Sequence, residues 1–594
     1  MAEQLPGRRP VFSGAHHEVF LDAKRLAAAV VGTDGAPWFT LRLLHAVDAT
    51  DGIDETLGSP QLSVTEQPGA TVLRVVAASS RWEHRWTELR CDADGFSLTG
   101  GVRGHGSVLQ VHAFAGYRPP SGFLPSGSAL RSAVSPNPDH PRRIVRDAVE
   151  PATIAVTGSG AEPGVGRWLF TPAPWCLAVS RSERAGDQQP PAGEWAWLGL
   201  LAPIEQQTFT ALHYLPGPEG FSVRLEYEGH TRVDGEFTVP RIDIRFGAAD
   251  PIAAIAAHSA AAREFGRDAA GPDPLTAGDP VPAVPDWWRE PMFCGWGAQR
   301  ALAEHDPGGN RHAPDWCTQA NYDAFLGALA AGGVTPGTVV VDDKWSLRYA
   351  TCTPDPERWP DLAGWIRARQ RAGQRVLLWW KAWDPDGAPP EACIRLPDGT
   401  PVAVDPDSEA GAALVSTAVT GMLSASGLGA DGLKIDFTAS TPSGAALRSA
   451  GPRWGAALLH RLLQLVYRAA KAARPDALII THTPNPAFAD VTDMLRLNDA
   501  MMLDSPDPSV DVPSHMAFRA AVVRAAMPGT PIDTDGWCMP DRPGWRSYVA
   551  LQPSLGVPAL YYADGFDRTT ERLTNNDHRL LRDTWRAYRE SLSR

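Results

Sequence analysis

The stretch Gly432-Leu-Lys-Ile-Asp-Phe437 is a short apolar run that ends in charged residues. Similar runs recur along the second half of the 594-residue chain and alternate with stretches of helical composition. The predicted strands are residues 291–296, 338–343, 375–381, 432–437, 478–483, 494–499, 531–535 and 558–563. Eight strands alternating with helices over about 300 residues are typical of a (β/α)8 TIM barrel, in which functional groups lie at the C-terminal ends of the strands.

Helices are predicted between these strands. They cover residues 319–331, 361–372, 412–426, 453–473 and 515–526. About 30 residues follow the last strand, which leaves room for one closing helix at 576–591. The barrel is therefore expected to span residues 287–594.

The first 250 residues have a different pattern, in which short runs alternate apolar and polar residues between Gly, Pro, Asp and Ser clusters. These runs are residues 38–47, 71–78, 107–117, 167–179, 194–201, 221–228 and 241–246. The pattern predicts an N-terminal antiparallel β-sandwich over 1–250. Residues 251–265 are Ala-rich and 271–286 are rich in Pro and Gly, so 251–286 is predicted to be a helix followed by a linker.

The composition narrows the class of protein. A net charge of −13 argues against a nucleic-acid partner, which requires a basic surface. No run is long and apolar enough for a membrane span, and the N-terminus lacks the apolar core of a signal peptide, so we expect a cytoplasmic protein. The 7 cysteines are scattered singly, which argues against a disulfide framework. The 21 tryptophans suit carbohydrate, because their flat faces stack on sugar rings as well as filling cores.

Acids, cations and aromatic residues gather at the predicted strand ends. They are Asp342, Asp343 and Trp345 after the second strand, Trp380 and Lys381 on the third, Lys434 and Asp436 on the fourth, His482 on the fifth, Arg496 and Asp499 on the sixth, and Asp535 and Trp537 after the seventh. Lys434 and Asp436 are two residues apart and project to the same side of the strand. A neighbouring cation keeps a carboxylate ionised, as a nucleophile must be. Arg496 and Asp499 are three residues apart, so on a regular strand their side chains would lie on opposite faces. Either the strand bends at its end or Arg496 has a structural role.

Paired carboxylates at a barrel mouth, surrounded by tryptophans, suit glycoside hydrolysis. A metal-dependent hydrolase would need several histidines at strand ends, and of the 16 histidines only His482 clearly lies at one. The Gly-rich stretches lack the dinucleotide-binding pattern. We therefore expect a carbohydrate substrate and neither a metal nor another cofactor.

The barrel half resembles the clan of α-retaining glycosidases that contains the melibiase-type α-galactosidases of families 36 and 27 and, more distantly, family 31. The matching motifs are Val-Asp-Asp-Lys-Trp at 341–345, Leu-Lys-Ile-Asp-Phe at 433–437 and Leu-Arg-Leu-Asn-Asp at 495–499. The resemblance implies that Asp436 is the nucleophile and Asp499 the acid/base. It also implies that Asp342, Asp343 and Lys434 bind sugar hydroxyls, and that the sandwich contributes to the pocket or to a homo-oligomer contact.

Two alternatives to an α-galactosidase-like hydrolase stay open. A transglycosidase would use the same residues but pass the sugar to another sugar instead of water. A glycan-binding barrel without catalysis would use the tryptophans as stacking platforms. After the fifth strand the chain has Thr-His-Thr-Pro-Asn-Pro at 481–486 where family 36 galactosidases carry a Cys- and Gly-rich loop, so the sugar is left open.

Overall fold

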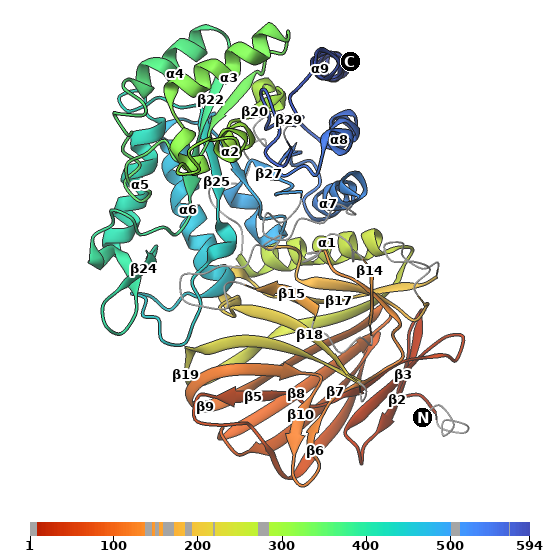
Figure 1. Ribbon diagram of the computed structural model, residues 1–594. Helices are drawn as coiled ribbons and strands as arrows, with labels where there is room; N and C mark the ends of the chain where they lie inside the picture. The colour runs from red at the N-terminus through yellow and green to blue at the C-terminus, as the bar shows by residue number, and fades with distance from the viewer. Residues whose placement is uncertain are drawn as a thin grey trace.

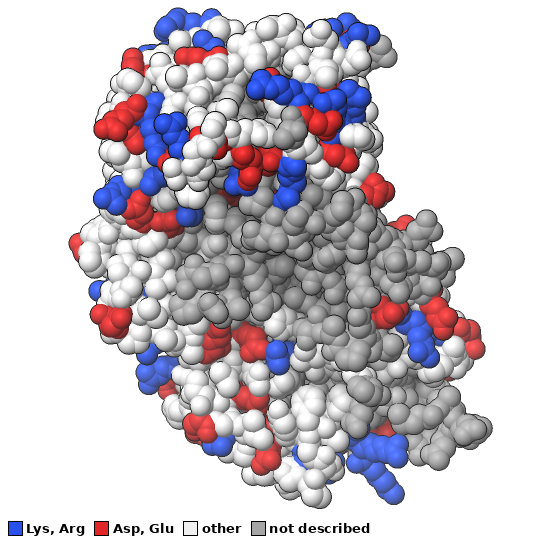
Figure 2. Space-filling model, in the orientation of Figure 1, with Lys and Arg blue, Asp and Glu red and all other residues white. Residues whose placement is uncertain are grey.

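The structure is a computed structural model. It describes residues 9–136, 145–148, 154–158, 172–183, 193–217, 220–270, 284–500, 511–569 and 571–593. The chain forms a β-rich N-terminal half and a barrel, with one helix lying at their junction (Figure 1). On the face in Figure 2, acidic and basic side chains are interspersed over the described part of the surface.

The N-terminal half contains two large antiparallel sheets. The smaller has the order β1 (Phe12–Ser13), β2 (His17–Asp22), β3 (Ala27–Gly32), β4 (Pro37–Arg42) and β12 (Gly127–Ser128). The larger has the main order β14 (Val145–Asp147), β13 (Ser132–Val134), β16 (Cys176–Ser180), β17 (Trp195–Leu201), β19 (Gly220–Ala248), β9 (Gly95–Ala113), β8 (His84–Asp92), β7 (Ala70–Ser79) and β6 (Thr56–Gln67). Added to it are β5 (Ala46–Ala49), β15 (Ile154–Gly158) and β18 (Ala211–Gly217), and β10 (Gly116–Arg118) pairs with β11 (Gly122–Leu124) in a separate hairpin.

The inner faces of the two large sheets share one core. Trp38 of the smaller sheet contacts Phe246 of the larger at 5.0 Å between ring centroids, and His17 contacts Phe96 at the same separation. Burial of apolar and aromatic faces between antiparallel sheets is what stabilises a sandwich. The predicted sandwich is confirmed.

One long strand replaces two predicted ones. Residues 221–228 and 241–246 both belong to β19, whose register with β9 shifts between Glu226 and Thr231 and again between Val239 and Ile242. These irregularities bend the strand without ending it, which the alternation of residues alone did not indicate. Of the predicted run 167–179, residues 167–171 lie outside the described residues.

The barrel strands are parallel and follow the predicted order. They are β20 (Met292–Cys294), β21 (Thr338–Val341), β22 (Arg375–Lys381), β25 (Gly432–Asp436), β26 (Leu478–Thr481), β27 (Met494–Arg496), β28 (Ile532–Asp533) and β29 (Ala559–Leu560). β29 pairs with β20, and a bridge between Asp533 and Val557 links the remaining edges. All eight strands lie within the predicted ranges, and most end before the polar residues that follow them.

Helices surround this barrel. They are α2 (Trp296–Glu304), α3 (Gln319–Ala331), α4 (Leu362–Arg371), α5 (Glu409–Leu423), α6 (Gly455–Ala473), α7 (Val512–Ala526), α8 (Arg542–Leu555) and the closing helix α9 (Asn575–Leu592). Short 3-10 turns lie at Ile204–Gln206, Asp286–Arg289, Ala313–Trp316, Pro390–Ala392, Thr438–Ser440 and Pro486–Val491, and β23 (Cys393–Arg395) pairs with β24 (Pro401–Val404). The helix α5 begins earlier than predicted because Ser408 caps it by accepting a hydrogen bond from the Gly411 N–H.

The helix α1 (Pro251–Ala270) joins the two halves and packs against β17 and α7. It extends the predicted helix 251–265, and residues 271–283 of the predicted linker lie outside the described residues. None of the helices in the described part of the chain combines the length and the apolar character that a membrane span requires.

The sandwich also contacts the segment that follows β25. Glu228 accepts a hydrogen bond from the Gly444 N–H at 2.8 Å, and His230 Nε2 lies 3.1 Å from the Gly444 carbonyl oxygen. The His230 ring stacks on Trp454 with 3.5 Å between centroids. At the start of α6, the Ala457 N–H donates to the Gln207 carbonyl of the sandwich. The two halves therefore share backbone hydrogen bonds as well as side-chain contacts.

We expect Gly455→Ala to loosen this junction. Gly455 has φ +54°, and a Cβ there would overlap the carbonyl oxygen of Phe209 in the sandwich. The substitution should lower the free energy of unfolding by about 2 kcal/mol or more, measured as a lower melting temperature. Gly421→Ala, within α5 and with open space at its Cβ, is the matched control and should melt at or above the wild-type temperature. Equal melting of the two variants would contradict the described junction.

Candidate active site

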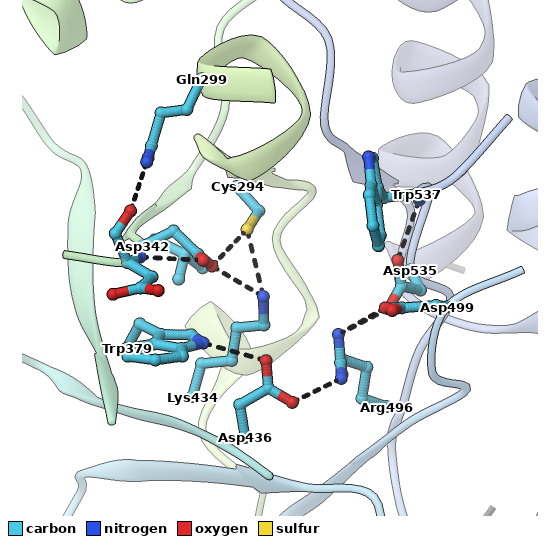
Figure 3. A network of polar contacts seen from close by, with 12 residues as sticks. Cys294, Gln299, Asp342, Trp379, Lys434, Asp436, Arg496, Asp499, Asp535 and Trp537 are labelled. Carbon is cyan, nitrogen blue, oxygen red and sulfur yellow. Dashed lines mark hydrogen bonds and ion pairs between the residues drawn. The ribbon is translucent and has the colours of Figure 1, made fainter. Parts of the chain in front are cut away.

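The C-terminal ends of the barrel strands bring the predicted residues together (Figure 3). In the register of β22 and β25, Trp379 lies opposite Lys434 and Lys381 lies opposite Asp436. Side chains alternate along a strand, so these four residues share the inner side of the barrel. The chain needs glycine at Gly432, the start of β25, because a Cβ there would overlap the Leu478 carbonyl oxygen of β26.

Asp436 lies at the end of β25 with two strong donors on its carboxylate. Arg496 Nη2 lies 3.0 Å from Oδ1, and the indole Nε1 of Trp379 donates to Oδ2 at 3.0 Å. Burial alone would raise the pKa of Asp436, but the charges of Arg496 and Lys434 outweigh it and hold the pKa well below its usual range. Asp436 is therefore ionised at neutral pH.

Lys434 lies deeper in the barrel and is paired with Asp342. Its Nζ donates to Asp342 Oδ2 at 2.7 Å, and Cys294 Sγ donates to the same oxygen at 2.9 Å. Burial opposes the ammonium charge, but the carboxylate of Asp342 prevails and raises the pKa of Lys434. Burial also raises the pKa of the Cys294 thiol, which stays protonated as a donor. The ammonium group of Lys434 is therefore charged and held in place near Asp436.

Arg496 is the centre of the site. Its Nη1 lies 3.1 Å from Asp535 and 3.3 Å from Asp499, while Nη2 binds Asp436 and the side-chain oxygen of Asn498. The difference in parity between Arg496 and Asp499 is resolved by the backbone, because β27 ends at Arg496 and Asn498 turns with φ +67°. The strand bends at its end, as one of the two predicted alternatives required.

Asp499 differs from Asp436 in its proton affinity. Burial raises the pKa of Asp499 to about 7, and the neighbouring carboxylates of Asp535 and Asp436 add to the rise against the opposing charge of Arg496. The exposed fractions of the Asp436 and Asp499 side chains are 13% and 24%, against 3% for Arg496. Both carboxyl groups therefore reach the open mouth of the barrel, whereas the guanidinium between them lies below it.

His482 and Asp533 complete the buried layer. His482 is fully buried, and burial, with the charge of Arg496, lowers its pKa to about 3, so its imidazole is neutral. Asp533 accepts a hydrogen bond from the Asp535 N–H at 2.8 Å. Burial and the carboxylate of Asp535 raise the pKa of Asp533 to about 7.

One wall of the mouth comes from the loop after β21 and the end of β22. The Tyr349 hydroxyl donates to Asp343 at 2.9 Å. Burial raises the pKa of Asp343 to about 7, although this hydrogen bond opposes the rise. Lys381 Nζ lies 2.7 Å from Asp384 and 4.4 Å from the centre of the Tyr349 ring. Lys381 is thus paired within the protein and also borders the mouth.

Two of the predicted tryptophans are buried, and their side chains lie away from the mouth. Trp345 is 1% exposed and donates its indole N–H to the Trp379 carbonyl, so it packs beneath the site. Trp380 lies one residue out of phase with Trp379 and Lys381 and lies beside Cys352, facing away from the barrel axis.

The predicted residues after the seventh strand are placed below the mouth. Asp535 is fully buried and accepts hydrogen bonds from Arg496 and from the N–H groups of Gly536 and Trp537, so it supports the arginine. Trp537 is 5% exposed and donates its indole N–H to Asp567. Substrate contact by any of the buried residues stays a prediction.

Sequence reasoning missed three residues of the site. Trp379 could have been found, because it shares the parity of Lys381 on a strand whose inner face was already assigned. Cys294 ends the first strand, but a lone cysteine carried no signal of a partner. Tyr349 lies in an irregular loop that has no periodicity to read.

We expect Asp499→Asn to stabilise the protein more at pH 8 than at pH 5. The folded-state pKa of about 7 lies above the ordinary unfolded value of about 4, so the wild type loses stability as pH rises between these values. Asparagine carries no proton to lose, and the melting temperature of the variant should therefore gain on the wild type with rising pH.

The matched control for this experiment is Asp398→Asn. Hydrogen bonds from Thr400 lower the pKa of this exposed carboxyl, which is ionised throughout the same pH range. Its difference from the wild type should not change between pH 5 and pH 8. The same constant difference for Asp499→Asn would show that Asp499 titrates as an ordinary aspartate.

No protein-family model matches the chain, and no curated protein matches it in sequence. Solved structures match its fold. An α-N-acetylgalactosaminidase from Bifidobacterium bifidum, a quadruple mutant, has a TM-score of 0.59 at 14% identity, covering 98% of this chain and 92% of that chain. A family 31 sulfoquinovosidase from E. rectale has 0.57 at 10% identity, covering 97% and 82%, and an α-galactosidase from Lactobacillus brevis has 0.52 at 11%, covering 97% and 83%. The chain therefore shares the fold of these three structures, a β-sandwich followed by a TIM barrel.

Proposed function

We propose that this chain is a retaining α-glycoside hydrolase that removes a terminal α-linked sugar through a covalent glycosyl-enzyme. The proposal rests on one observation above all. Asp436, held ionised, and Asp499, holding its proton up to about pH 7, bind the two terminal nitrogens of one arginine at the mouth of the barrel. A nucleophile and an acid of raised pKa, close together, are the pair that this mechanism requires.

The first step is attack of the Asp436 carboxylate on the anomeric carbon. The bond from that carbon to the leaving oxygen breaks as the Asp499 proton passes to the oxygen. The buried charges of Lys434 and Arg496 stabilise the ionised nucleophile before the attack and after its release. Because both nitrogens that hold the pair belong to one rigid guanidinium, the two carboxyl groups keep a fixed separation.

The second step reverses the roles of the pair. Asp499, now ionised, takes a proton from water, and the resulting oxygen attacks the anomeric carbon while the Asp436 carboxylate leaves. Two inversions give net retention of configuration. Asp343 and Lys381, which border the mouth, are proposed to bind sugar hydroxyls.

The proposed sugar is a terminal α-galactoside or a close relative. The motifs at 341–345 and 433–437 support an α-galactosidase-like site. Proteins with this fold include an α-galactosidase, an α-N-acetylgalactosaminidase and a sulfoquinovosidase, which defines a short panel of sugars. Aryl α-glycosides of these three sugars and of glucose, with their β-anomers, make up the first assay. Added acceptor sugars would reveal a transglycosidase by new glycosides among the products.

We expect Asp436→Ala to lose more than about 1,000-fold in kcat/KM on the α-glycoside that the wild type hydrolyses. Azide should restore turnover and give the β-glycosyl azide, because the small anion enters the space left by the carboxylate. With Asp499→Ala, azide should instead give the α-glycosyl azide, since it attacks the glycosyl-enzyme. NMR of the azide products distinguishes the two.

The control for the pair is Asp490→Asn. Asp490 is an exposed carboxylate in the loop after β26, paired with His460, and its substitution should leave the rate unchanged. An α-azide from Asp436→Ala, or a product of inverted configuration from the wild type, would overturn the mechanism.

We expect Trp379→Phe to lower kcat about 10-fold. Phenylalanine lacks the indole N–H that orients the Asp436 carboxylate and stabilises it as it leaves the sugar. Trp380→Phe changes the neighbouring residue, which faces away from the site, and should keep nearly full activity. Equal losses in the two variants, measured with the same aryl glycoside, would show that strand packing rather than the hydrogen bond matters.

A further inference from the structure

The acid/base Asp499 follows a turn whose backbone is held from three sides. The Leu497 N–H donates to the Asp533 carbonyl at 3.0 Å, and the Ala500 N–H donates to the Trp537 carbonyl at 2.7 Å. Between them Asn498 has a left-handed φ of +67°. A non-glycine residue in this conformation costs about 1 kcal/mol or more, so the surroundings must hold it there.

The third contact comes from Arg519 on α7. Its Nη1 lies 2.8 Å from the Leu497 carbonyl oxygen, 3.1 Å from that of Asn498 and 2.8 Å from that of Asp499. The Arg519 side chain is 7% exposed. One buried cation thus serves three successive carbonyl groups, and burial lowers its pKa only to about 10, so it stays charged at neutral pH.

We propose that Arg519 is a positioning residue for the acid/base, an inference that rests on the proposed function. These three hydrogen bonds are made to backbone oxygens. By fixing the carbonyl groups of Leu497, Asn498 and Asp499, Arg519 sets the direction in which the Asp499 side chain leaves the turn. Asp499 is thereby aimed at Arg496 and at the glycosidic oxygen.

The chemistry gives this role a specific signature. A displaced acid slows only those substrates whose leaving oxygen needs a proton. A glycosyl fluoride needs much less proton donation from the enzyme to leave, so its reaction reports binding and the Asp436 attack. A residue with a general structural role would slow both kinds of substrate together.

The test compares Arg519→Gln with Arg524→Gln. Arg524 lies on the same helix and also binds two backbone carbonyls, those of Ser554 and Leu555, but at the far side from the site. We expect Arg519→Gln to lower kcat/KM about 100-fold on the alkyl α-glycoside and by less than about 5-fold on the α-glycosyl fluoride of the same sugar. Arg524→Gln should leave kcat/KM unchanged on both substrates. If Arg519→Gln fails to fold, Arg519→Lys, which keeps the charge but only one donor group, takes its place.

Hydrogen exchange gives a second readout that needs no substrate. The amides of residues 495–500 should exchange faster in Arg519→Gln than in the wild type, and at wild-type rates in Arg524→Gln. A wild type that hydrolyses no α-glycoside would defeat the proposed function, while the exchange data would still decide the role of Arg519 in the turn. Equal losses on both substrates, or unchanged exchange at 495–500, would overturn the inference.

Discussion

The burial of several carboxyl groups beside few cations is the constraint on which the barrel end depends. Asp342, Asp436, Asp499, Asp533 and Asp535 lie on or just after four strands. Lys434 binds Asp342, and Arg496 binds Asp436, Asp499 and Asp535. The charges of Asp499 and Asp535 also act on the buried Arg519 and oppose the fall in its pKa. Not every negative charge can be compensated, so the carboxyl groups differ in their pKa values. Asp436, beside the charges of Arg496 and Lys434, stays ionised, whereas burial leaves Asp499 and Asp533 holding protons up to about pH 7. The same imbalance leaves one ionised and one protonated carboxyl group in one site, the pair that the proposed mechanism uses.

The backbone adopts unfavourable conformations where the barrel strands end. Phe437, Asn498, Asp535 and Trp383 all have positive φ, and each lies just beyond the end of a barrel strand. A left-handed residue other than glycine costs about 1 kcal/mol or more and ends the regular alternation of side chains. That break in alternation is why Arg496 and Asp499 meet although their spacing assigns them to opposite faces. The geometry of the site therefore depends on the chain leaving the regular strand at a defined residue.

The features of the fold that depend on the regular geometry of strands and helices could be predicted from the sequence. Eight strands, their order and the shared face of Lys434 and Asp436 follow from composition and parity, and the structure confirms the fold. The alternation of side chains would also have indicated Trp379, which lies on the same face as Lys381 and binds Asp436. The rest depends on contacts between distant segments. Neither the turn that Arg519 holds nor the packing of Trp345 beneath the site has a local pattern, because the partners lie 20 or more residues apart along the chain.

The sandwich contributes to this arrangement, since it contacts the segment that follows β25. Glu228 and His230 bind the N–H and the carbonyl oxygen of Gly444, which belong to the two peptide groups on either side of its Cα, and Trp454 is stacked against His230 just before α6 begins. This segment connects β25 to α6, and its other end starts at Phe437, next to Asp436. A loop anchored at both ends has little freedom, so the ionised carboxylate stays where Arg496 and Trp379 hold it. On this reasoning the N-terminal half stabilises one wall of the barrel mouth as well as packing against the barrel, and the two halves form one functional unit.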